Sequence, residues 1–338
     1  MRVGINGFGR MGRLALRAAW GRDDLEIVAI NEPNGTAEVM ATLLEFDSIH
    51  GRFDRDCRGT DDAIVIDGTA VPYSRHAEPV DIPWRELGVD LVLECSGRFR
   101  TTESIEPHFT NGARRVVVSA PVKGGPPNIV VGVNHQDFDL ASERLVTAAS
   151  CTTNCLAPVV RVLHDAIGIA RGTVTTIHDP TNTQVVVDRW HKDARRGRAS
   201  QLNLIPTSSN SAYAVQMVIP ELEGKLTSMA VRVPVLNASI TDCSFEMARD
   251  TTAEEINAAL LTASREGPLV GILGYEERPL VSSDYARDPR SGIVDAPSTN
   301  VTDGRLAKLI VWYDNEGGYA NRLVELAAMV ADAGVTPA

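Results

Sequence analysis

The residues best suited to catalysis in this sequence lie in the segment 150–155, where two cysteines flank hydroxyl and amide side chains. The apolar run 145–149 before it predicts a buried strand, and the apolar-periodic segment 156–167 after it predicts a helix. Cys151 is therefore expected at a strand-to-helix junction, where unpaired backbone N–H groups and the helix dipole favour a negative charge. Such a junction suits a nucleophilic thiolate, although a buried, inert cysteine beside capping hydroxyls fits the same segment.

A histidine at the end of a predicted strand could serve as the partner of this cysteine. The segment 172–178 alternates like a strand and ends at His178, far enough along the chain that only the fold could bring it to Cys151. A Cys–His pair would keep the thiolate ready and provide a proton carrier. A lone histidine at a strand end is more often structural, and only the signal around Cys151 favours a catalytic role.

Basic and hydroxyl-bearing residues follow in the second half of the chain. The segment 188–198 is basic in an acidic chain, which is typical of a solvated loop but also suits a phosphorylated substrate, because arginine binds phosphate through paired N–H groups. The hydroxyl-rich segment 206–211 precedes a predicted helix and could bind an anion. Arg232 lies between apolar neighbours in a predicted strand, where a buried arginine needs a carboxylate or phosphate partner.

The N-terminus has a glycine motif, 7–12, between a predicted strand, 2–6, and a predicted helix, 14–20. In such a motif the first glycine permits the tight turn, the second lets a pyrophosphate approach the backbone, and the third lets helix and strand pack closely. Glu32 ends the next predicted strand, where an acid accepts hydrogen bonds from an adenosine ribose and repels a 2′-phosphate. This combination favours NAD over NADP as the cofactor.

Strand and helix patterns alternate up to about residue 150 and predict a parallel sheet covered on both faces. Ligands bind at the carboxyl ends of such strands. On this ground the residues that could line the cofactor are Ser96, Gly97, Phe99 and Ser119, although small residues there also form plain turns. Longer alternating strands follow, with a closing helix predicted over 316–333. We expect an α/β protein with a Rossmann-type NAD-binding domain over 1–150 and an α+β catalytic domain over 151–315 that contains a large, mostly antiparallel sheet.

Length and composition fit a soluble protein of two domains. The chain has 338 residues, 43% of them apolar, five cysteines and a formal net charge of −11. The acidic charge argues against nucleic-acid binding, no apolar run is long enough for membrane insertion, and no signal-peptide layout is present. The cysteines form neither a disulfide framework nor a metal cluster, so we expect a reduced, cytoplasmic protein without a metal site. Cys57, Cys95 and Cys243 are expected to be buried, and His50 and His76 to be solvated.

Five stretches resemble the phosphorylating glyceraldehyde-3-phosphate dehydrogenase family and follow that family's order along nearly the whole chain. They are 4–12, 149–158, 191–198, 231–234 and 312–316. The stretch around Cys151 is highly specific, and the glycine motif is much less so. The resemblance implies NAD as cofactor, glyceraldehyde 3-phosphate and inorganic phosphate as substrates, and a homotetramer whose C-terminal helix, 316–338, completes the NAD-binding domain.

The resemblance also implies a role for individual residues. Cys151 attacks the aldehyde to give a thiohemiacetal with His178 as general base, hydride transfer to NAD leaves a thioester, and phosphate cleaves it to an acyl phosphate. The residues implied for the substrate's own phosphate are Thr181 and Arg232. Those implied for the attacking phosphate are Ser150, Thr152, Arg195, Ser209 and Asn210. Those implied for the cofactor are Asn6, Gly7, Phe8, Gly9, Arg10, Met11, Gly12, Glu32, Ser96, Gly97, Ser119 and, at the nicotinamide carboxamide, Asn315.

Some positions depart from the family's pattern. Thr183 replaces a usual aspartate, Asn210 a glycine and Gly317 a tryptophan. Arg189 and Trp190 replace an apolar residue and a proline near the cofactor ribose. These departures concern the phosphate sites and the preference for NAD.

Three segments, 178–184, 274–279 and 288–295, resemble the branch of the family associated with arsenic-resistance operons. There arsenate replaces phosphate, and the product, 1-arseno-3-phosphoglycerate, is exported by a partner membrane protein. The alternatives are an erythrose-4-phosphate dehydrogenase, a semialdehyde dehydrogenase that reduces acyl phosphates, and a non-catalytic paralogue that binds NAD or RNA. The basic segment favours a phosphorylated substrate, and the presence of both Cys151 and His178 favours a catalyst.

Overall fold

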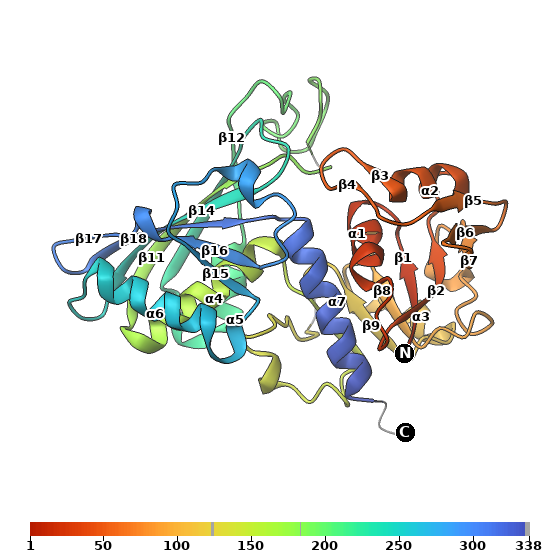
Figure 1. Ribbon diagram of the computed structural model, residues 1–338, viewed down its shortest axis with the longest axis horizontal. Helices are drawn as coiled ribbons and strands as arrows, with labels where there is room; N and C mark the ends of the chain where they lie inside the picture. The colour runs from red at the N-terminus through yellow and green to blue at the C-terminus, as the bar shows by residue number, and fades with distance from the viewer. Residues whose placement is uncertain (123–124, 183, 335–338) are drawn as a thin grey trace. The chain divides into compact units, whose positions relative to one another are not determined.

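The computed structural model describes residues 1–122, 125–182 and 184–334 (Figure 1). Its internal contacts divide the chain into two compact units, one formed by Met1–Ala149 with the segment from Ala320 onward and the other by Ser150–Tyr319. Thr183 and the last four positions of the expected C-terminal helix lie outside the described residues. Within the described ranges, no helix is both long and apolar enough to cross a membrane.

The first unit is built on an eight-stranded sheet with the order β10-β9-β8-β1-β2-β7-β6-β5. Strands β10 through β7 in this order pair in parallel, and β6 and β5 add an antiparallel edge. The strands are β1 (Arg2–Asn6), β2 (Glu26–Asn31), β5 (Cys57–Gly59), β6 (Ala63–Ile66), β7 (Thr69–Ser74), β8 (Leu91–Glu94), β9 (Arg115–Val118) and β10 (Leu145–Thr147). Because β1 pairs with β2 on one side and β8 on the other, the strand order reverses at β1, where open parallel sheets bind ligands.

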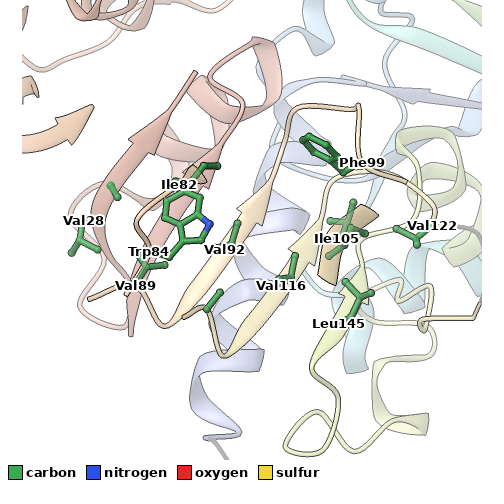
Figure 2. Packing of buried hydrophobic residues seen from close by; sticks show 13 residues of the cluster. Val28, Ile82, Trp84, Val89, Val92, Phe99, Ile105, Val116, Val122 and Leu145 are labelled. Atoms are coloured by element: carbon green, nitrogen blue, oxygen red, sulfur yellow. The ribbon is translucent and has the colours of Figure 1, made fainter. Parts of the chain in front are cut away.

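Helices and a small hairpin complete this unit. They are α1 (Arg10–Ala19), α2 (Ala37–Glu45), the strand pair β3 (Phe46–Asp47) and β4 (Gly51–Arg52), η1 (Pro79–Asp81), α3 (Thr102–Thr110), η2 (His135–Asp137) and α7 (Gly317–Asp332). Apolar side chains of the sheet, of α3 and of the connecting segments form one core cluster, in which Trp84, Val92, Ile105 and Val116 are at most 1% exposed (Figure 2).

The second unit contains a sheet with the order β12-β13-β11-β14-β18-β16-β15, and β17 pairs with β18. Among the described strands of this second sheet, only the pairs β11–β13 and β15–β16 are parallel, so the expected large, mostly antiparallel sheet is confirmed. The strands are β11 (Ile169–His178), β12 (Ile205–Ser208), β13 (Leu226–Arg232), β14 (Ser239–Met247), β15 (Leu273–Glu276), β16 (Gly292–Asp295), β17 (Asn300–Thr302) and β18 (Leu306–Tyr313). The helices are α4 (Cys151–Ala166), α5 (Ser211–Val218), η3 (Pro220–Leu222), α6 (Ala253–Arg265), η4 (Gly267–Leu269), η5 (Ser282–Tyr285) and η6 (Ala296–Ser298).

Three expectations from the sequence need correction. The C-terminal helix begins at Gly317 and ends at Asp332, because Gly334 has a φ of 71°, the left-handed conformation that commonly follows a helix C-terminus. His50 is buried rather than solvated, since it lies in the turn between β3 and β4 and its N–H donates to Asp47. Cys57 is only half-buried, because it lies on the edge strand β5.

Candidate active site

Cys151 is the first residue of α4, and Ser150 caps this helix. The Ser150 hydroxyl accepts a hydrogen bond from the Thr153 backbone N–H at 3.2 Å and contacts the Thr153 hydroxyl at 2.7 Å. The helix therefore begins five residues earlier than the apolar period alone suggests, because the cap, and not the first apolar residue, sets its start. The half-buried Cys151 thiol lies at the positive end of the helix dipole.

The structure brings His178 to this thiol. The Nε2 atom of His178 lies 3.9 Å from Cys151 Sγ, and the imidazole is 5% exposed. His178 is the last residue of β11, on which α4 packs, and this explains how two positions far apart in the sequence meet. The distance allows a proton to pass between sulfur and imidazole after a small approach.

Asp179 holds the other side of the imidazole. Its Oδ1 atom lies 2.6 Å from His178 Nδ1, and the residue is 2% exposed. Its carboxylate also accepts hydrogen bonds from the Ser239 hydroxyl at 3.2 Å and from Asn315 Nδ2 at 3.0 Å. The carboxylate is thus buried but well supplied with donors, as a buried charge requires.

Arg232 approaches the same nitrogen of the imidazole. It lies opposite His178 in the parallel register of β11 and β13. Its Nη1 atom is 2.6 Å from His178 Nδ1 and donates to the backbone oxygen of Asp179 at 2.8 Å. Its Nε atom is buried and has no hydrogen-bond partner among the described residues. This leaves one donor of a guanidinium available for an anion.

The neighbours of His178 determine its charge. Burial by itself lowers the pKa of the imidazole, but the Asp179 carboxylate and the Cys151 sulfur favour the charged form and raise the pKa to about 9. Arg232 opposes them with its positive charge. Burial also lowers the pKa of Arg232, against the attraction of Cys151 and Asp179. The site therefore favours a positively charged imidazole beside Cys151 Sγ.

The predicted phosphate-binding residues fall into two groups. Ser150, Thr152 and Arg232 lie beside Cys151 or His178, and the Thr152 hydroxyl is 3.9 Å from Cys151 Sγ. Thr181, which follows β11, and Ser209, next to α5, are each half-buried, whereas Asn210 and Arg195 are exposed. Asn210 caps α5 without a side-chain hydrogen bond.

Several residues that sequence reasoning missed belong to this cluster. Asp179 and Ser239 support the imidazole, and Tyr313 hydrogen-bonds to Thr152. Arg196, next to the predicted Arg195, donates to the buried Thr207 hydroxyl at 2.8 Å. The only sequence signal for Asp179 is its position directly after His178, which does not reveal that its carboxylate turns back onto Nδ1.

The first unit contains the glycine loop, and the geometry of each glycine fits the role predicted for it from the sequence. Gly7 has a φ of 89°, and a Cβ there would lie 2.4 Å from the Ser96 backbone. A Cβ at Gly12 would lie 2.1 Å from the Gly7 oxygen, whereas one at Gly9 would meet nothing within 4 Å. Gly7 and Gly12 therefore permit the turn and the close packing, and Gly9 leaves space through which a pyrophosphate could approach the N-terminus of α1.

The carboxylates at the ends of β2 and β8 hold this loop. Glu32 accepts hydrogen bonds from the Phe8 N–H at 2.8 Å and the Asn34 N–H at 3.0 Å. Glu94 accepts them from Asn6 Nδ2 at 2.5 Å and the Ser96 N–H at 2.8 Å. The acidic group at Glu32 thus lies against the glycine loop, which fits a ribose partner of a dinucleotide.

The remaining predicted cofactor residues of the first unit lie around the same loop. Arg10 forms an ion pair with Asp47, and the pKa of Asp47 falls to about 2 because backbone N–H groups and Arg10 outweigh the effect of burial. Gly97 has a φ of 67°, and the Ser119 N–H donates to the Glu94 backbone oxygen at 2.9 Å. Asn6 and Phe8 are buried, and Met11 is half-buried. Asn315, in the other unit, is buried against Asp179.

In the part of the chain that the structure describes, no group of histidine, cysteine or acidic side chains could hold a metal ion. A cysteine paired with a histidine at a helix N-terminus, in a chain with a dinucleotide-binding loop, defines the class of cysteine-dependent dehydrogenases.

Comparison with known proteins identifies the family. Residues 1–102 match the NAD binding domain of glyceraldehyde 3-phosphate dehydrogenase, and residues 150–315 match its C-terminal domain. The chain is 58% identical to glyceraldehyde-3-phosphate dehydrogenase 3 of Nostoc sp. over 98% of both proteins. It is 49% identical to the enzyme of Cereibacter sphaeroides over 97% of both and 46% identical to that of Geobacillus stearothermophilus over 99% of both. The chain belongs to the glyceraldehyde-3-phosphate dehydrogenase family.

Proposed function

We propose that this chain is an NAD-dependent, phosphorylating glyceraldehyde-3-phosphate dehydrogenase with Cys151 as its nucleophile. The observation that carries the proposal is the contact of 3.9 Å between Cys151 Sγ and His178 Nε2 at the N-terminus of α4. The names of the relatives support the substrate, and the match to the family's NAD-binding domain supports the cofactor.

In the first step His178 takes the thiol proton through Nε2, and the Cys151 thiolate attacks the carbonyl carbon of the aldehyde. The carbonyl oxygen takes the proton back from Nε2, which gives a thiohemiacetal and a neutral His178. The positive end of the α4 dipole stabilises the thiolate. Arg232 and Thr181 would bind the substrate's own phosphate, and the unpartnered Nε of Arg232 supplies a buried donor for it.

In the second step His178 accepts the hydroxyl proton of the thiohemiacetal as a general base. Bound NAD would supply the acceptor for the hydride that leaves the same carbon, and a thioester would remain on Cys151. The loop 6–12 with Glu32, Ser96, Gly97 and Ser119 would hold NAD in the first unit. Asn315 would bind the nicotinamide carboxamide.

In the third step inorganic phosphate attacks the thioester. The carbon–sulfur bond breaks, Cys151 returns to the thiolate and an acyl phosphate leaves. Ser150, Thr152, Arg195, Ser209 and Asn210 would bind this phosphate. Asn210 keeps the backbone N–H that a glycine would offer but adds an exposed side chain.

Arsenate could take the place of phosphate in this third step, because the two anions have nearly the same shape and charge. The segments 178–184, 274–279 and 288–295 support arsenate as the physiological nucleophile and 1-arseno-3-phosphoglycerate as the product.

We further propose that the chain forms a homotetramer in a reduced, cytoplasmic setting. Large apolar side chains of the second unit are exposed around the segment 186–204, among them Trp190 at 88% and Leu202 at 83%. Such exposure is typical of an interface surface. Light scattering on a sizing column gives the mass directly, and a monomer would contradict this part of the proposal.

One assay tests the reaction. Purified protein is mixed with glyceraldehyde 3-phosphate and NAD, and NADH is followed with phosphate, with arsenate and with neither anion. Sustained NADH formation that requires one of the anions is expected, and erythrose 4-phosphate serves as the competing substrate. Cys151→Ser should abolish NADH formation and leave NAD binding nearly unchanged, whereas Cys57→Ser, a matched control on the edge strand β5, should be fully active. An active Cys151→Ser variant would show that Cys151 is not the nucleophile.

A further inference from the structure

The Nδ1 atom of His178 has two charged neighbours of opposite sign at equal distance. Asp179 Oδ1 and Arg232 Nη1 each lie 2.6 Å from it. A carboxylate accepts a proton and therefore selects the tautomer with hydrogen on Nδ1, whereas a guanidinium only donates and selects a bare Nδ1. The tautomer of His178 decides whether Nε2, which faces Cys151, can accept the thiol proton.

Hydrogen bonding favours Asp179 in this competition. Arg232 Nη1 has a second acceptor, the Asp179 backbone oxygen at 2.8 Å, and keeps that bond when Nδ1 carries a proton. The Asp179 carboxylate is 2% exposed, so water cannot replace a lost N–H donor. The tautomer with hydrogen on Nδ1 therefore leaves both charged groups paired.

We propose that Asp179 is a positioning residue of this site, whose carboxylate holds the hydrogen of His178 on Nδ1 so that the bare Nε2 faces Cys151. The sulfur–hydrogen bond of Cys151 then breaks as the proton moves to Nε2, and an imidazolium–thiolate pair results. The inference rests on the proposed function for the reaction that follows, but the proton exchange itself requires only the residues of the second unit.

The surroundings fix the Asp179 carboxylate in place. The Ser239 hydroxyl lies 3.2 Å from both the Asp179 N–H and Oδ1. The Asn315 amide can face the carboxylate only through its N–H group, which lies 3.0 Å from Oδ2. Pro180 follows directly and restricts the Asp179 backbone to extended conformations. Because Ser239, Asn315 and Pro180 together restrict Asp179, its carboxylate can fix the ring orientation of His178.

The groups that face His178 come from four elements or segments: Cys151 from α4, Asp179 from the segment after β11, Arg232 from β13 and the ring of Tyr313 from β18. Only Asp179 and the sulfur favour a positive imidazole, and they raise the pKa of His178 to about 9 despite burial. Without the Asp179 carboxylate, the acceptor that remains at Nδ1 is the Asp179 backbone oxygen at 2.8 Å, and Arg232 Nη1 already donates to that oxygen at 2.8 Å. The hold on the Nδ1 hydrogen would weaken, and the tautomer with hydrogen on Nε2, which cannot accept the thiol proton of Cys151, would become more populated.

The experiment measures the rate at which iodoacetamide alkylates Cys151 as a function of pH, in the absence of substrate. Burial and the nearby Glu45 raise the pKa of the Cys57 thiol to about 11, so this half-buried thiol reacts slowly near neutral pH. The Cys151→Ser variant measures the alkylation of the other cysteines, which is subtracted. In Asp179→Asn, alkylation near neutral pH should fall about tenfold and its rise should move to higher pH, since a tenfold change corresponds to one pKa unit. The kcat should fall by about 100-fold or more with little change in the KM for the aldehyde.

Asp242→Asn is the matched control, because Asp242 lies on β14 of the same sheet and pairs with Lys308 at 2.6 Å. This variant should keep the wild-type alkylation profile and kcat. Thermal unfolding shows whether Asp179→Asn is folded, and Asp179→Glu, which keeps the charge, should recover part of the alkylation rate. A wild-type alkylation profile in folded Asp179→Asn would overturn the inference, even if its kcat fell. Failure of the wild-type protein to form NADH would overturn the proposed function instead, and the alkylation profile would still test Asp179.

Discussion

The hydroxyl groups of Thr152 and Tyr313 lie 2.9 Å apart, and the Tyr313 ring packs edge-on against His178 with a centroid distance of 6.0 Å. The last residue of β18 thus contacts both the first turn of α4 and the imidazole. Tyr313 is 1% exposed, and burial raises the pKa of its phenol well above the usual value, so it serves as a neutral hydrogen-bonding group.

Tyr313→Phe should therefore weaken both the fold and the reaction, but modestly. The buried Thr152 hydroxyl loses its partner, and we expect a loss of about 1–2 kcal/mol in the free energy of unfolding. The kcat should fall by less than about tenfold, because Cys151 and His178 keep their contact. Denaturant titration and steady-state kinetics measure the two effects. Tyr275→Phe, at a half-buried position on β15, is the control and should change neither.

The raised pKa of His178 predicts a specific dependence of stability on pH. A group that binds its proton more tightly in the folded state stabilises the fold fully below its unfolded pKa of 6.5, and this contribution is lost as the pH rises through about 9. The difference in denaturant midpoint between the wild type and His178→Asn should shrink over this interval. A difference that stays constant or grows with pH would show that the imidazole is not held in the charged form. The same variant should lose about 100-fold or more in kcat.

Substitution of two glycines of the loop should cause two different defects, one in stability and one in NAD binding. Gly7→Ala places a Cβ 2.4 Å from the Ser96 backbone at a φ of 89° and should destabilise the first unit strongly. Gly9→Ala meets nothing within 4 Å and should leave the unfolding temperature nearly unchanged. Its methyl group would lie where the pyrophosphate approaches, so NAD affinity should fall about tenfold or more, equal to about 1.4 kcal/mol. Calorimetry of unfolding and of NAD binding separates the two, and normal NAD affinity in Gly9→Ala would place the cofactor elsewhere.

The position of Glu32 at the end of β2 predicts a preference for NAD over NADP. Glu32→Gln removes the charge that repels a 2′-phosphate, and its amide oxygen can still accept the Phe8 N–H. The ratio of kcat/KM for NADP over NAD should rise about tenfold. Glu38→Gln, on the first turn of α2, should leave the ratio unchanged. An unchanged ratio in Glu32→Gln would show that Arg189 and Trp190, or other positions, set the preference.

Sequence patterns located much of this fold, because periodicity and caps are local properties. Strand β1 spans the predicted residues 2–6, and β11 ends at His178 as the alternation predicted. The start of α4 did not follow from the apolar period, since the Ser150 side chain and not an apolar residue begins that helix. The burial of His50 also escaped prediction, because it depends on the β3–β4 hairpin folding around Asp47.

The candidate site was only partly predictable for a related reason. The specific segment around Cys151 pointed to the candidate nucleophile, but the approach of His178 depends on the packing of α4 against β11. The contact of Asp179 with His178 depends on the conformation of the Asp179 side chain. The positions of Ser239 and Asn315 beside it depend on the pairing of β14 with β11 and β18. Contacts between distant strands leave no periodic signal in the chain.

The Glu94 carboxylate joins the ends of neighbouring strands through Asn6 and Ser96, and it also contacts His108 Nε2 at 3.1 Å. Because Trp84 donates to His108 Nδ1, the imidazole must donate through Nε2, so the carboxylate depends on several donors that water cannot replace. Substitutions at these positions are therefore coupled energetically, and the effect of two together will differ from the sum of each alone. Any redesign of this dinucleotide-binding loop therefore has to change the Glu94 carboxylate and its hydrogen-bond donors together.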